Sequence, residues 1–230
     1  EHLGLYICPD LDTVCYTLAG LANPATGWGR ADETWNGLET LEVLGGPTWF
    51  RLGDRDLGLH LERTRRKQLG QPLSQITQDV CTALGVLPRV LPMSDDPVPT
   101  WVCTRDEGEL PFQDYFVRRQ CQPQVEGFRF AGAELAQPAP GVIEALQTAD
   151  RVVICPSNPW VSIAPILAIP GIKTALRERS IVAVSPIIAG QTVKGPAAKM
   201  YTELGIRPSA LAVARHYTEL LAHVFQPLGF

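Results

Sequence analysis

Residues 152–159, Val-Val-Ile-Cys-Pro-Ser-Asn-Pro, constrain the fold of this 230-residue chain more than any other segment. Their apolar, β-branched start predicts a buried strand, and the prolines and polar residues that follow predict a turn where the strand ends. An open parallel sheet binds its ligands in the crevice beyond the carboxyl ends of its strands. This turn is therefore where we expect a nucleotide to bind.

The chain beyond residue 150 alternates between strand signals and helix signals. Strands are expected at 151–155 and 181–185, and helices at 162–168, 172–178, 196–204 and from 209 onward. Strands that alternate with helices imply right-handed crossovers and a parallel sheet.

The first 85 residues combine one strand signal with a run of helix signals. Residues 3–8 are short, apolar and partly β-branched, and the apolar spacing over 12–21 predicts a helix after them. Further helices are expected at 34–44, 57–69 and 74–84, the last with Ser74 as its N-cap.

Strand signals return at 89–92, 100–104 and 112–117, with a hairpin-like turn at 106–108. We expect an α/β fold, a Rossmann-like three-layer parallel sheet with a helical insertion that forms a substrate-binding subdomain. Residues 1–22 and 86–230 would form the nucleotide-binding core, and residues 23–85 the mainly helical insertion.

The composition argues against nucleic acid and membrane as partners. The net charge is -4, whereas nucleic-acid binding is driven by positive charge. The basic run 63–67 is short and has no interleaved aromatic residue, which is typical of a solvated helix face. Prolines interrupt the most apolar region, so no stretch approaches the length of a membrane span.

The cysteines and the first residue bear on the compartment and on the extent of the chain. Six cysteines without a Cys-x-x-Cys pair indicate a reducing compartment, so we expect a cytoplasmic protein. The chain opens at Glu1 rather than Met and runs almost at once into an apolar segment. We therefore expect it to lack its true amino terminus.

Two carboxylates stand at positions i and i+2 in Pro9-Asp-Leu-Asp-Thr13. Asp10 and Asp12 can both reach one ion, and magnesium (Mg2+) takes one or two carboxylates and leaves its other positions to phosphates and water. We expect a metal site at Asp10 and Asp12, with Thr13 as a further contact to metal or substrate. The alternative is that Asp12 or Thr13 caps the following helix.

A second constellation is Leu52-Gly-Asp-Arg-Asp-Leu57, which places Arg55 between two acids. A guanidinium group can make a bidentate contact to phosphate, and Asp54 would then contact substrate beside it. The alternative is a surface ion pair between Arg55 and Asp54 or Asp56.

Polar residues also follow the strand signals. Ser157 and Asn158 offer donors to an anion at a helix amino terminus, and Lys194 holds the equivalent place after the next strand, although a lone lysine is usually solvated. Ser94 and Asp95 follow the signal at 89–92, where they would contact substrate or form a capping turn.

These motifs resemble the 2-phospho-L-lactate transferase family of coenzyme F-420 biosynthesis, which includes members that transfer phosphoenolpyruvate. The resemblance covers nearly the whole chain and rests on six motifs in order: Pro9-Asp-Leu-Asp-Thr13, Asn23-Pro-Ala-Thr-Gly-Trp-Gly29, Leu52-Gly-Asp-Arg-Asp-Leu57, Leu91-Pro-Met-Ser-Asp-Asp96, Cys155-Pro-Ser-Asn-Pro159 with Ser162-Ile163, and Val184-Ser-Pro186 with Lys194-Gly-Pro196. Against the family, the chain lacks a strand with a glycine-rich loop and a second acidic turn before Glu1, and a strand and helix after Phe230.

The resemblance implies a transferase. The donor would be a guanosine-diphosphate-linked phospholactate or enolpyruvyl phosphate, and the acceptor 7,8-didemethyl-8-hydroxy-5-deazariboflavin. The terminal ribityl hydroxyl of this deazaflavin would attack the donor phosphorus, and GMP would leave. In such an in-line displacement, charge neutralisation and positioning dominate catalysis.

The resemblance also assigns roles. Asp10 and Asp12 would serve magnesium or the attacking hydroxyl, Arg55 the phosphate, Ser157 and Asn158 the nucleotide, and Lys194 a diphosphate oxygen. Residues 23–85 would cradle the deazaflavin, with Trp28 or Trp35 as stacking partners or as core residues. The three-carbon acid and a homodimer are left open.

A binding protein is the alternative to an enzyme. A related nucleotide-sugar-binding family, active in the regulation of cell-envelope metabolism, shares the strand, the polar turn and a Ser-Ile-x-Pro arrangement. Such a binder needs no paired carboxylates for magnesium, so Asp10 and Asp12 favour the transferase.

Overall fold

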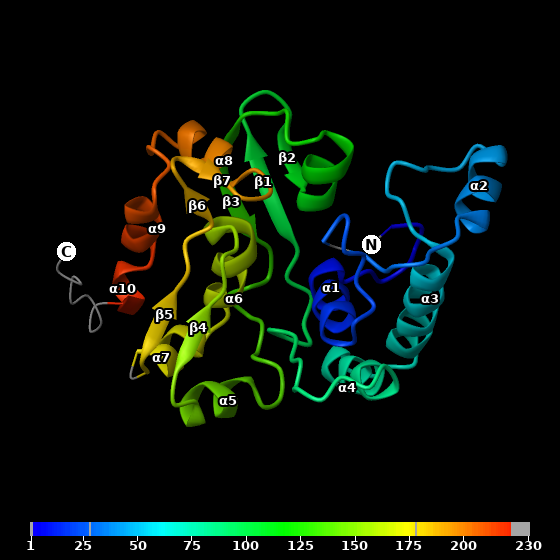
Figure 1. Cartoon of the computed structure of the whole chain (residues 1–230), viewed down its shortest axis with the longest axis horizontal. Helices are drawn as coiled ribbons and strands as arrows, with labels where there is room; N and C mark the ends of the chain where they lie inside the picture. Colours follow the sequence, from blue (N-terminus) through cyan, green and yellow to red (C-terminus); the bar gives the residue numbers. More distant parts are fainter. Residues whose placement is uncertain (1, 28, 178, 222–230) are drawn as a thin grey trace. The chain divides into compact units, whose positions relative to one another are not determined.

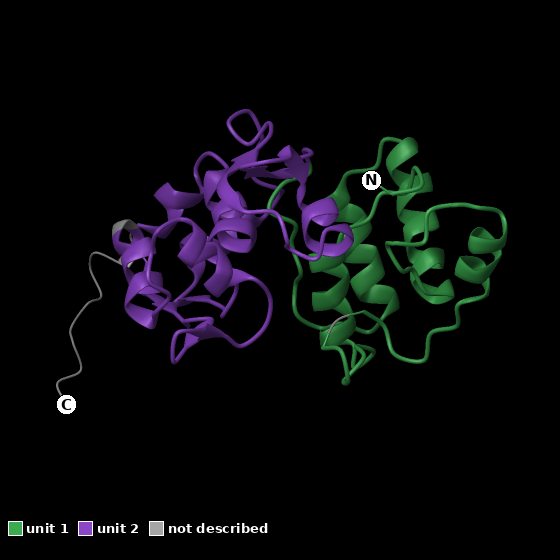
Figure 2. Cartoon of the chain, turned by 90° about the horizontal axis from the view of Figure 1, so that it is seen from above, with its two compact units in different colours: residues 1–95 green, residues 96–230 purple. Residues whose placement is uncertain are grey.

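The chain folds into two compact units, residues 1–95 and 96–230 (Figure 2). The computed structural model describes residues 2–27, 29–177 and 179–221. The contacts group residues 1–22 and 86–95 with 23–85, whereas the sequence analysis joined them to the second unit. The functional division into a nucleotide-binding core and an insertion stays a prediction.

The described part of the first unit is helical (Figure 1). Its helices are α1 (Pro9–Leu18), α2 (Asn36–Val43), α3 (Asp54–Gln68) and α4 (Leu73–Ala83). All four were predicted, but α1 begins three residues earlier than expected. Asp12 and Thr13 therefore lie inside α1, whose N-cap is Cys8, and the capping alternative for them is wrong.

The predicted strand at 3–8 is also wrong. His2 and Leu5 form an isolated bridge, and the two residues between them, Leu3 and Gly4, have φ angles of 54° and 71°. Such left-handed angles turn the chain back on itself, so this segment does not run as an extended strand.

The helices of the first unit pack through apolar stripes. On α4 the buried residues Leu73, Ile76, Thr77 and Cys81 recur at helical spacing. Cys81 and Val86 pack with Cys15 of α1, and the sulfur atoms of the two cysteines lie 3.2 Å apart. Full burial of a large apolar side chain contributes about 1.5–3 kcal/mol, so these stripes hold α1 and α4 together.

The second unit opens with an antiparallel sheet of order β2-β1-β3, formed by β1 (Thr100–Thr104), β2 (Gly108–Pro111) and β3 (Val125–Phe130). The predicted strand at 100–104 and the hairpin turn after it are confirmed. A parallel sheet was expected, but a short turn can join only antiparallel neighbours, and these strands form an antiparallel sheet.

Two predicted strands around this sheet are wrong. Residues 112–117 are helical instead and include most of the π-helical turn η1 (Asp114–Arg118). The rings of Phe112 and Phe116 stack with centroids 5.4 Å apart, whereas in a strand residues four positions apart are about 13 Å apart. Residues 89–92 form no strand, and the prolines at 88 and 92 remove backbone donors there.

A parallel pair follows. β4 (Val152–Ile154) pairs with β5 (Ile181–Ala183), as predicted, and α5 (Val142–Thr148) precedes it. The crossover consists of η2 (Pro159–Ile163), α6 (Ala164–Ala168) and α7 (Ile172–Leu176). Helices and parallel strands are thus both present. In the described residues the sheets have two or three strands, so a continuous three-layer sheet is not seen.

The remaining elements are β6 (Ile187–Ile188), β7 (Gln191–Thr192), α8 (Ala197–Glu203), α9 (Ala210–His216) and α10 (Thr218–Leu221). The helices near 196–204 and 209 were predicted, and the Ser209 hydroxyl accepts a hydrogen bond from the N–H of Ala212 at the start of α9. The core of this unit is an apolar cluster of Val102, Leu110, Tyr115, Val125, Val161 and Met200.

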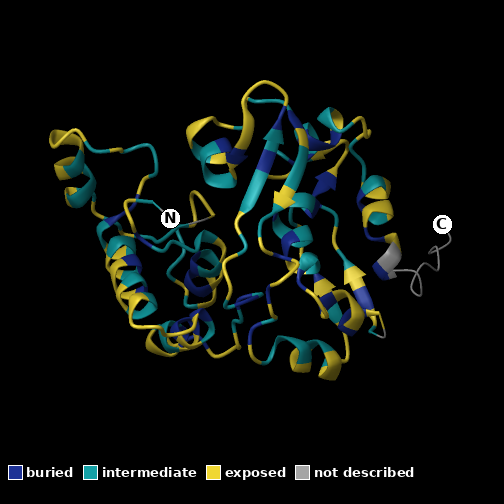
Figure 3. Cartoon of the chain, turned by 180° about the vertical axis from the view of Figure 1, so that it is seen from behind, coloured by how far each residue is buried: buried dark blue, intermediate teal, exposed yellow. Residues whose placement is uncertain are grey.

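Burial is uneven along the chain (Figure 3). Helices α2 and α5 contain no buried residue, whereas α1, α3 and α8 each place buried side chains against their neighbours. Among the described residues, no helix is both long enough and apolar enough to cross a membrane.

Candidate functional site

A buried ion pair lies in the interior of the first unit. Asp12, in the first turn of α1, is only 5% exposed, and Arg63 of α3 is 4% exposed. The guanidinium group of Arg63 donates to both carboxylate oxygens, with a distance of 3.1 Å between Nη1 and Oδ2 and a shorter one between Nη2 and Oδ1. Both oxygens of Asp12 are therefore occupied by one side chain of α3.

His60 completes this group. Its Nδ1 lies 3.2 Å from Nη1 of Arg63 and 3.8 Å from Oδ2 of Asp12. A guanidinium group only donates, so Nδ1 accepts a hydrogen bond and the ring is neutral. Burial, and to a lesser degree the Arg63 charge, lowers the pKa of His60 to about 4.

A second buried contact joins the same helices. The phenol of Tyr16 donates to Oδ1 of Asp56 at 2.6 Å, and the guanidinium carbon of Arg30 lies 5.8 Å from the centre of the Tyr16 ring. Burial raises the pKa of Asp56, while the hydrogen bond from Tyr16 and the charges of Arg63 and Arg30 oppose the rise.

These side chains line a pocket of about 70 Å³. The residues around it are Ile7, Pro9, Asp12, Thr13, Tyr16, Gly29, Phe50, Arg51, Leu52, Asp56 and His60. Pockets for drug-sized molecules have volumes of roughly 300–1,000 Å³, so this one has room for water or an ion rather than for a ring system. The lining thus includes Asp12 and Thr13 of the predicted site, and also Tyr16, Asp56 and His60.

Asp10 does not join Asp12. Residues two apart on an α-helix point in directions about 200° apart, and Asp10 is exposed whereas Asp12 is buried. Among the described residues no three His, Cys, Asp or Glu side chains gather to hold a metal ion. Because both oxygens of Asp12 accept from Arg63, the two carboxylates do not face one shared ion in this arrangement, and magnesium binding at Asp10 stays a prediction.

Arg55 is exposed in the first turn of α3. The alternative, an ion pair with Asp54 or Asp56, is not formed among the described residues, and both acids accept hydrogen bonds from other groups. Asp56 accepts from Tyr16, and Asp54 accepts from the Thr34 hydroxyl at 2.6 Å. The guanidinium group of Arg55 is thus presented to solvent, which is compatible with a phosphate contact.

Asp54 of α3 caps α2, and Glu33, three residues before α2, caps α3. Asp54 accepts from the N–H groups of Asn36 and Gly37 at 3.1 and 2.9 Å, at the start of α2. Glu33 accepts from the N–H groups of Arg55 and Asp56 at 2.9 and 3.0 Å, at the start of α3. Hydrogen bonds, first from Thr34 and then from Gly37, lower the pKa of Asp54 to about 2.

Gly53 makes this arrangement possible, since a Cβ atom there would collide with the Glu33 side chain. Asp54, which was expected to contact substrate beside Arg55, therefore has a structural role in this unit.

Asp95 caps α4, as the alternative predicted. Its two carboxylate oxygens accept from the N–H and the hydroxyl of Ser74, at 2.6 and 2.8 Å. Ser74 is therefore inside the first turn, and its predicted role as the N-cap is wrong because Pro72 holds that position. Ser94 is 3% exposed. A substrate contact for Ser94 and Asp95 stays a prediction.

In the second unit the polar turn lies where predicted, at the carboxyl end of β4. Asn158 is the N-cap of η2: its Oδ1 accepts from the N–H groups of Trp160 and Val161 at 3.0 and 3.4 Å. Its Nδ2 lies 3.1 Å from the sulfur of Met200. Ser157 beside it is half-buried. The Asn158 side chain thus holds the turn, and nucleotide binding by it stays a prediction.

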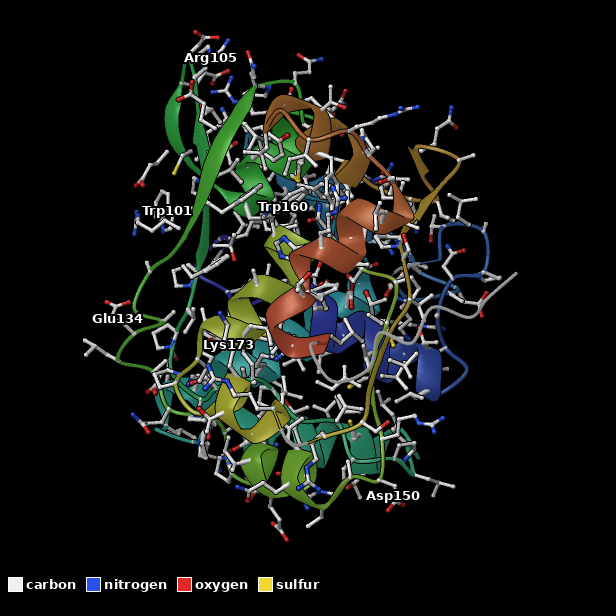
Figure 4. All side chains as sticks on the ribbon, turned by 90° about the vertical axis from the view of Figure 1, so that its left-hand side faces the viewer. Trp101, Arg105, Glu134, Asp150, Trp160 and Lys173 are labelled. Carbon is white, nitrogen blue, oxygen red and sulfur yellow. The ribbon has the colours of Figure 1, made fainter. Side chains whose placement is uncertain are left out.

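Trp160, which follows this turn and is labelled in Figure 4, packs among other aromatic side chains. Its ring centre lies 4.2 Å from that of Tyr201, 5.5 Å from that of His216 and 6.1 Å from that of Phe128. Lys194 is exposed and follows the β6–β7 hairpin. Lys194 was expected directly after β5, the strand that pairs with β4. This prediction is wrong, because the hairpin β6–β7 stands between β5 and Lys194.

The buried face of α3 was not predicted from the sequence. Asp56, His60 and Arg63 stand at positions i, i+4 and i+7, which is the spacing of one helix face, and this was the available signal. The run 63–67 was expected to be a solvated helix face, but Arg63 in it is buried. Trp35 is half-buried under the guanidinium group of Arg51, 4.5 Å from the ring centre, and Trp28 lies outside the described residues.

Comparison with known proteins now decides the family. Residues 1–224 match the sequence profile of the family 2-phospho-L-lactate transferase CofD. The chain belongs to this family. The resemblance seen in the motifs is thereby confirmed, and the protein is a transferase of the family of coenzyme F-420 biosynthesis.

Several relatives are named phosphoenolpyruvate transferase. That of Streptomyces griseus is 47% identical over 223 residues, which cover 94% of this chain and 70% of the relative. That of Thermobifida fusca is 48% identical over 218 residues, which cover 93% and 68%. That of Mycobacterium bovis is 45% identical over 222 residues, which cover 93% and 67%.

Among solved structures, two of a Bacillus halodurans protein are similar, and one of them is described as a member of the UPF0052 family. They are 19% identical to this chain with TM-scores of 0.47 and 0.48, and they cover 73% and 75% of it. The chain spans about half of their length, 49% and 51%.

Proposed function

We propose that this protein transfers a phosphoenolpyruvyl or phospholactyl group from a guanosine-diphosphate-linked donor to the ribityl hydroxyl of 7,8-didemethyl-8-hydroxy-5-deazariboflavin, and that GMP leaves. The match of residues 1–224 to the transferase family carries this proposal. The names of the relatives favour the phosphoenolpyruvyl group as the one transferred.

Arg55 supports the phosphate chemistry of this proposal. Its guanidinium group has no ion-pair partner among the described residues, while the acids on both sides of it are bound elsewhere. A planar guanidinium group matches two phosphate oxygens at once. We therefore assign Arg55 to the transferring phosphate.

Asp10 is the residue that would hold magnesium, together with phosphate oxygens of the donor. When bound there, the ion would neutralise charge on the phosphates. The buried Asp12 then acts through Arg63 and His60, which hold the first turn of α1 against α3. Thr13, Asp56 and Tyr16 line the adjoining pocket, where a hydroxyl group of the acceptor would find hydrogen-bond partners.

The second unit would supply the nucleotide site. Ser157 and Asn158 lie beyond the carboxyl end of a parallel strand, which is the usual place for a nucleotide in an α/β sheet. Lys194 would contact a diphosphate oxygen, and residues 23–85 would bind the deazaflavin. A Rossmann-like three-layer core, a homodimer and a cytoplasmic location belong to the same proposal.

Mass spectrometry of the product tests the function. The protein is incubated with the deazaflavin, Mg2+ and each of the two guanylyl donors, and GMP release is followed in parallel. We expect a product heavier than the deazaflavin by the transferred group, with one GMP formed for each product molecule. Binding of donor or acceptor without any GMP release would favour a binding protein instead.

Arg55 offers the sharpest variant for this reaction. Arg55→Lys keeps the charge but loses the planar fork, so we expect a fall in rate of roughly a hundredfold with little change in melting temperature. Arg65→Lys, on the exposed face of the same helix, is the matched control and should leave the rate unchanged. Equal rates for all three proteins would remove Arg55 from the site.

A further inference from the structure

A second pocket lies at the other end of the parallel strands, in the second unit. It has a volume of about 420 Å³ and is lined by Ile143, Gln147, Gly171, Thr174, Ala175 and Arg179. Its volume falls within the range of roughly 300–1,000 Å³ that is usual for small-molecule sites. None of its residues belongs to the site proposed above.

Two facing helices form the walls. Ile143 and Gln147 are four residues apart on α5, and Gly171, Thr174 and Ala175 have helical spacing at the start of α7 and within it. Gly171 has a φ of 87°, and a Cβ atom there would lie 3.7 Å from the end of the Ile143 side chain. That distance is an ordinary contact, so the left-handed backbone angle, and not a lack of room, favours glycine at this position.

Arg179 supplies the charge at one end of this pocket. It lies between α7 and β5, two residues before β5 begins. The next residue, Ser180, accepts a hydrogen bond through its carbonyl from the N–H of Val152 at 2.8 Å, which joins this segment to the start of β4. The Nη1 of Arg179 donates to the backbone carbonyl of Gln147 at 2.8 Å, which ties the guanidinium group to the end of α5. The group is therefore held in one place before any ligand arrives.

One donor of Arg179 is left over. Its Nε–H is buried and has no hydrogen-bond partner among the described residues. A buried donor without a partner is unfavourable, and native structures normally satisfy it with protein, water or a ligand. The Nε–H is covered by the protein, so an oxygen of a carboxylate or phosphate in the pocket would accept from the neighbouring Nη2, and would reach Nε only after the covering atoms shift.

The rest of the lining sets the kind of ligand. Thr174 and Gln147 add hydrogen-bonding side chains, while Ile143 and Ala175 give the pocket an apolar wall. We propose that this pocket binds a small metabolite through a carboxylate or phosphate group held by Arg179, with a short apolar body against Ile143 and Ala175. This pocket lies at the amino ends of β4 and β5, whereas Ser157 and Asn158 lie beyond the carboxyl end of β4. Figure 4 labels Lys173, which belongs to α7, and Asp150, which follows α5.

Calorimetric titration with two probes at constant ionic strength tests this proposal. Isobutyrate offers a carboxylate with a short apolar body, and inorganic phosphate offers the oxyanion alone. We expect saturable binding of one molecule per chain for at least one probe, and the probe that binds identifies the anion. In Arg179→Gln the affinity for the probe should fall at least tenfold. The affinity of Arg179→Lys should lie between that of the unchanged protein and that of Arg179→Gln.

Two further variants separate the pocket from general effects of charge and folding. Arg177→Gln removes an exposed charge two residues away that does not line the pocket, so its affinity should equal that of the unchanged protein. Ile143→Trp fills the pocket and leaves Arg179 in place, so binding should be lost at an unchanged melting temperature. No saturable binding of either probe, or equal losses in Arg177→Gln and Arg179→Gln, would overturn the proposal.

Discussion

Both units bury apolar side chains, but the interior of the first also holds a buried ion pair. In the first unit, Asp12 and Arg63 form a buried ion pair beside His60, between α1 and α3. In the second unit the core cluster is apolar, and Val102 and Met200 in it are fully buried. A buried ion pair gives little net stability because desolvation offsets the attraction, whereas apolar burial is favourable throughout. The ion pair of the first unit therefore fixes the direction of charged groups, whereas the apolar clusters of both units stabilise their folds.

Breaking the ion pair should have the largest effect. Arg63→Met leaves the carboxylate of Asp12 buried without a partner, which should lower the free energy of unfolding by about 3–5 kcal/mol. Urea unfolding followed by circular dichroism measures it. Arg65→Met is the matched control, because its ion pair with Glu62 is exposed and such pairs contribute about 0–1 kcal/mol.

The double variant Asp12→Leu with Arg63→Met sharpens the same point. Replacing a buried ion pair by apolar residues is often neutral or stabilising, so the double variant should recover most of the loss. It should not recover transferase activity if the pair positions α1 for catalysis. A double variant as unstable as Arg63→Met would mean that the pair itself stabilises the unit.

The apolar interior of the second unit should respond by cavity formation. Met200→Ala removes a fully buried side chain from the core cluster, and such substitutions lower the free energy of unfolding by about 2–5 kcal/mol. Leu135→Ala, at a residue 80% exposed in the same unit, should change it by less than about 0.5 kcal/mol. Similar losses for the two variants would contradict the assignment of the core.

His60 should make the first interior sensitive to pH. Its pKa is lowered from 6.5 to about 4 in the folded protein, so between these values the unfolded chain binds a proton that the folded chain does not. Stability is therefore fully present above pH 6.5 and falls as the pH drops towards 4. The whole effect is about 3 kcal/mol, at 1.36 kcal/mol per pKa unit.

His60→Gln tests this by removing the proton-binding group. The melting temperature of the variant should change less between pH 7 and pH 4 than that of the unchanged protein. Parallel pH profiles for the two proteins would show that His60 is not neutral in the folded state.

In both units, elements set by local patterns were predicted from the sequence, whereas contacts between distant residues were not. Local patterns gave the helices of the first unit, the strand β1 with the turn after it, and the parallel pair, because apolar spacing and turn residues act over a few positions. The antiparallel β3 was missed, since its pairing with β1 joins residues far apart in the chain. The ion pair was missed for the same reason: Asp12 and Arg63 are 51 residues apart.

Asp54 shows a further limit on prediction. The sequence placed it in a phosphate-binding motif, and its neighbours in the chain suggested a partner in Arg55. Its actual partners, Thr34, Asn36 and Gly37, lie at the start of another helix. Cross-capping between two helices cannot be read from the sequence of either one, because each cap depends on how the helices pack.

The smallest expected effect comes from this cap, at the surface of the same unit. The pKa of Asp54 is lowered from 3.8 to about 2 by its hydrogen bonds. Its contribution to stability is therefore present above about pH 4 and is lost as the pH falls from there towards 2. Asp54→Asn removes the charge, so the melting temperature of the variant should lie below that of the unchanged protein at pH 6 by more than it does at pH 2.5. The pH range of this effect lies below that of His60, so the two variants separate a surface cap from a buried neutral base. A difference between variant and unchanged protein that stays constant from pH 6 to pH 2.5 would contradict the charged cap.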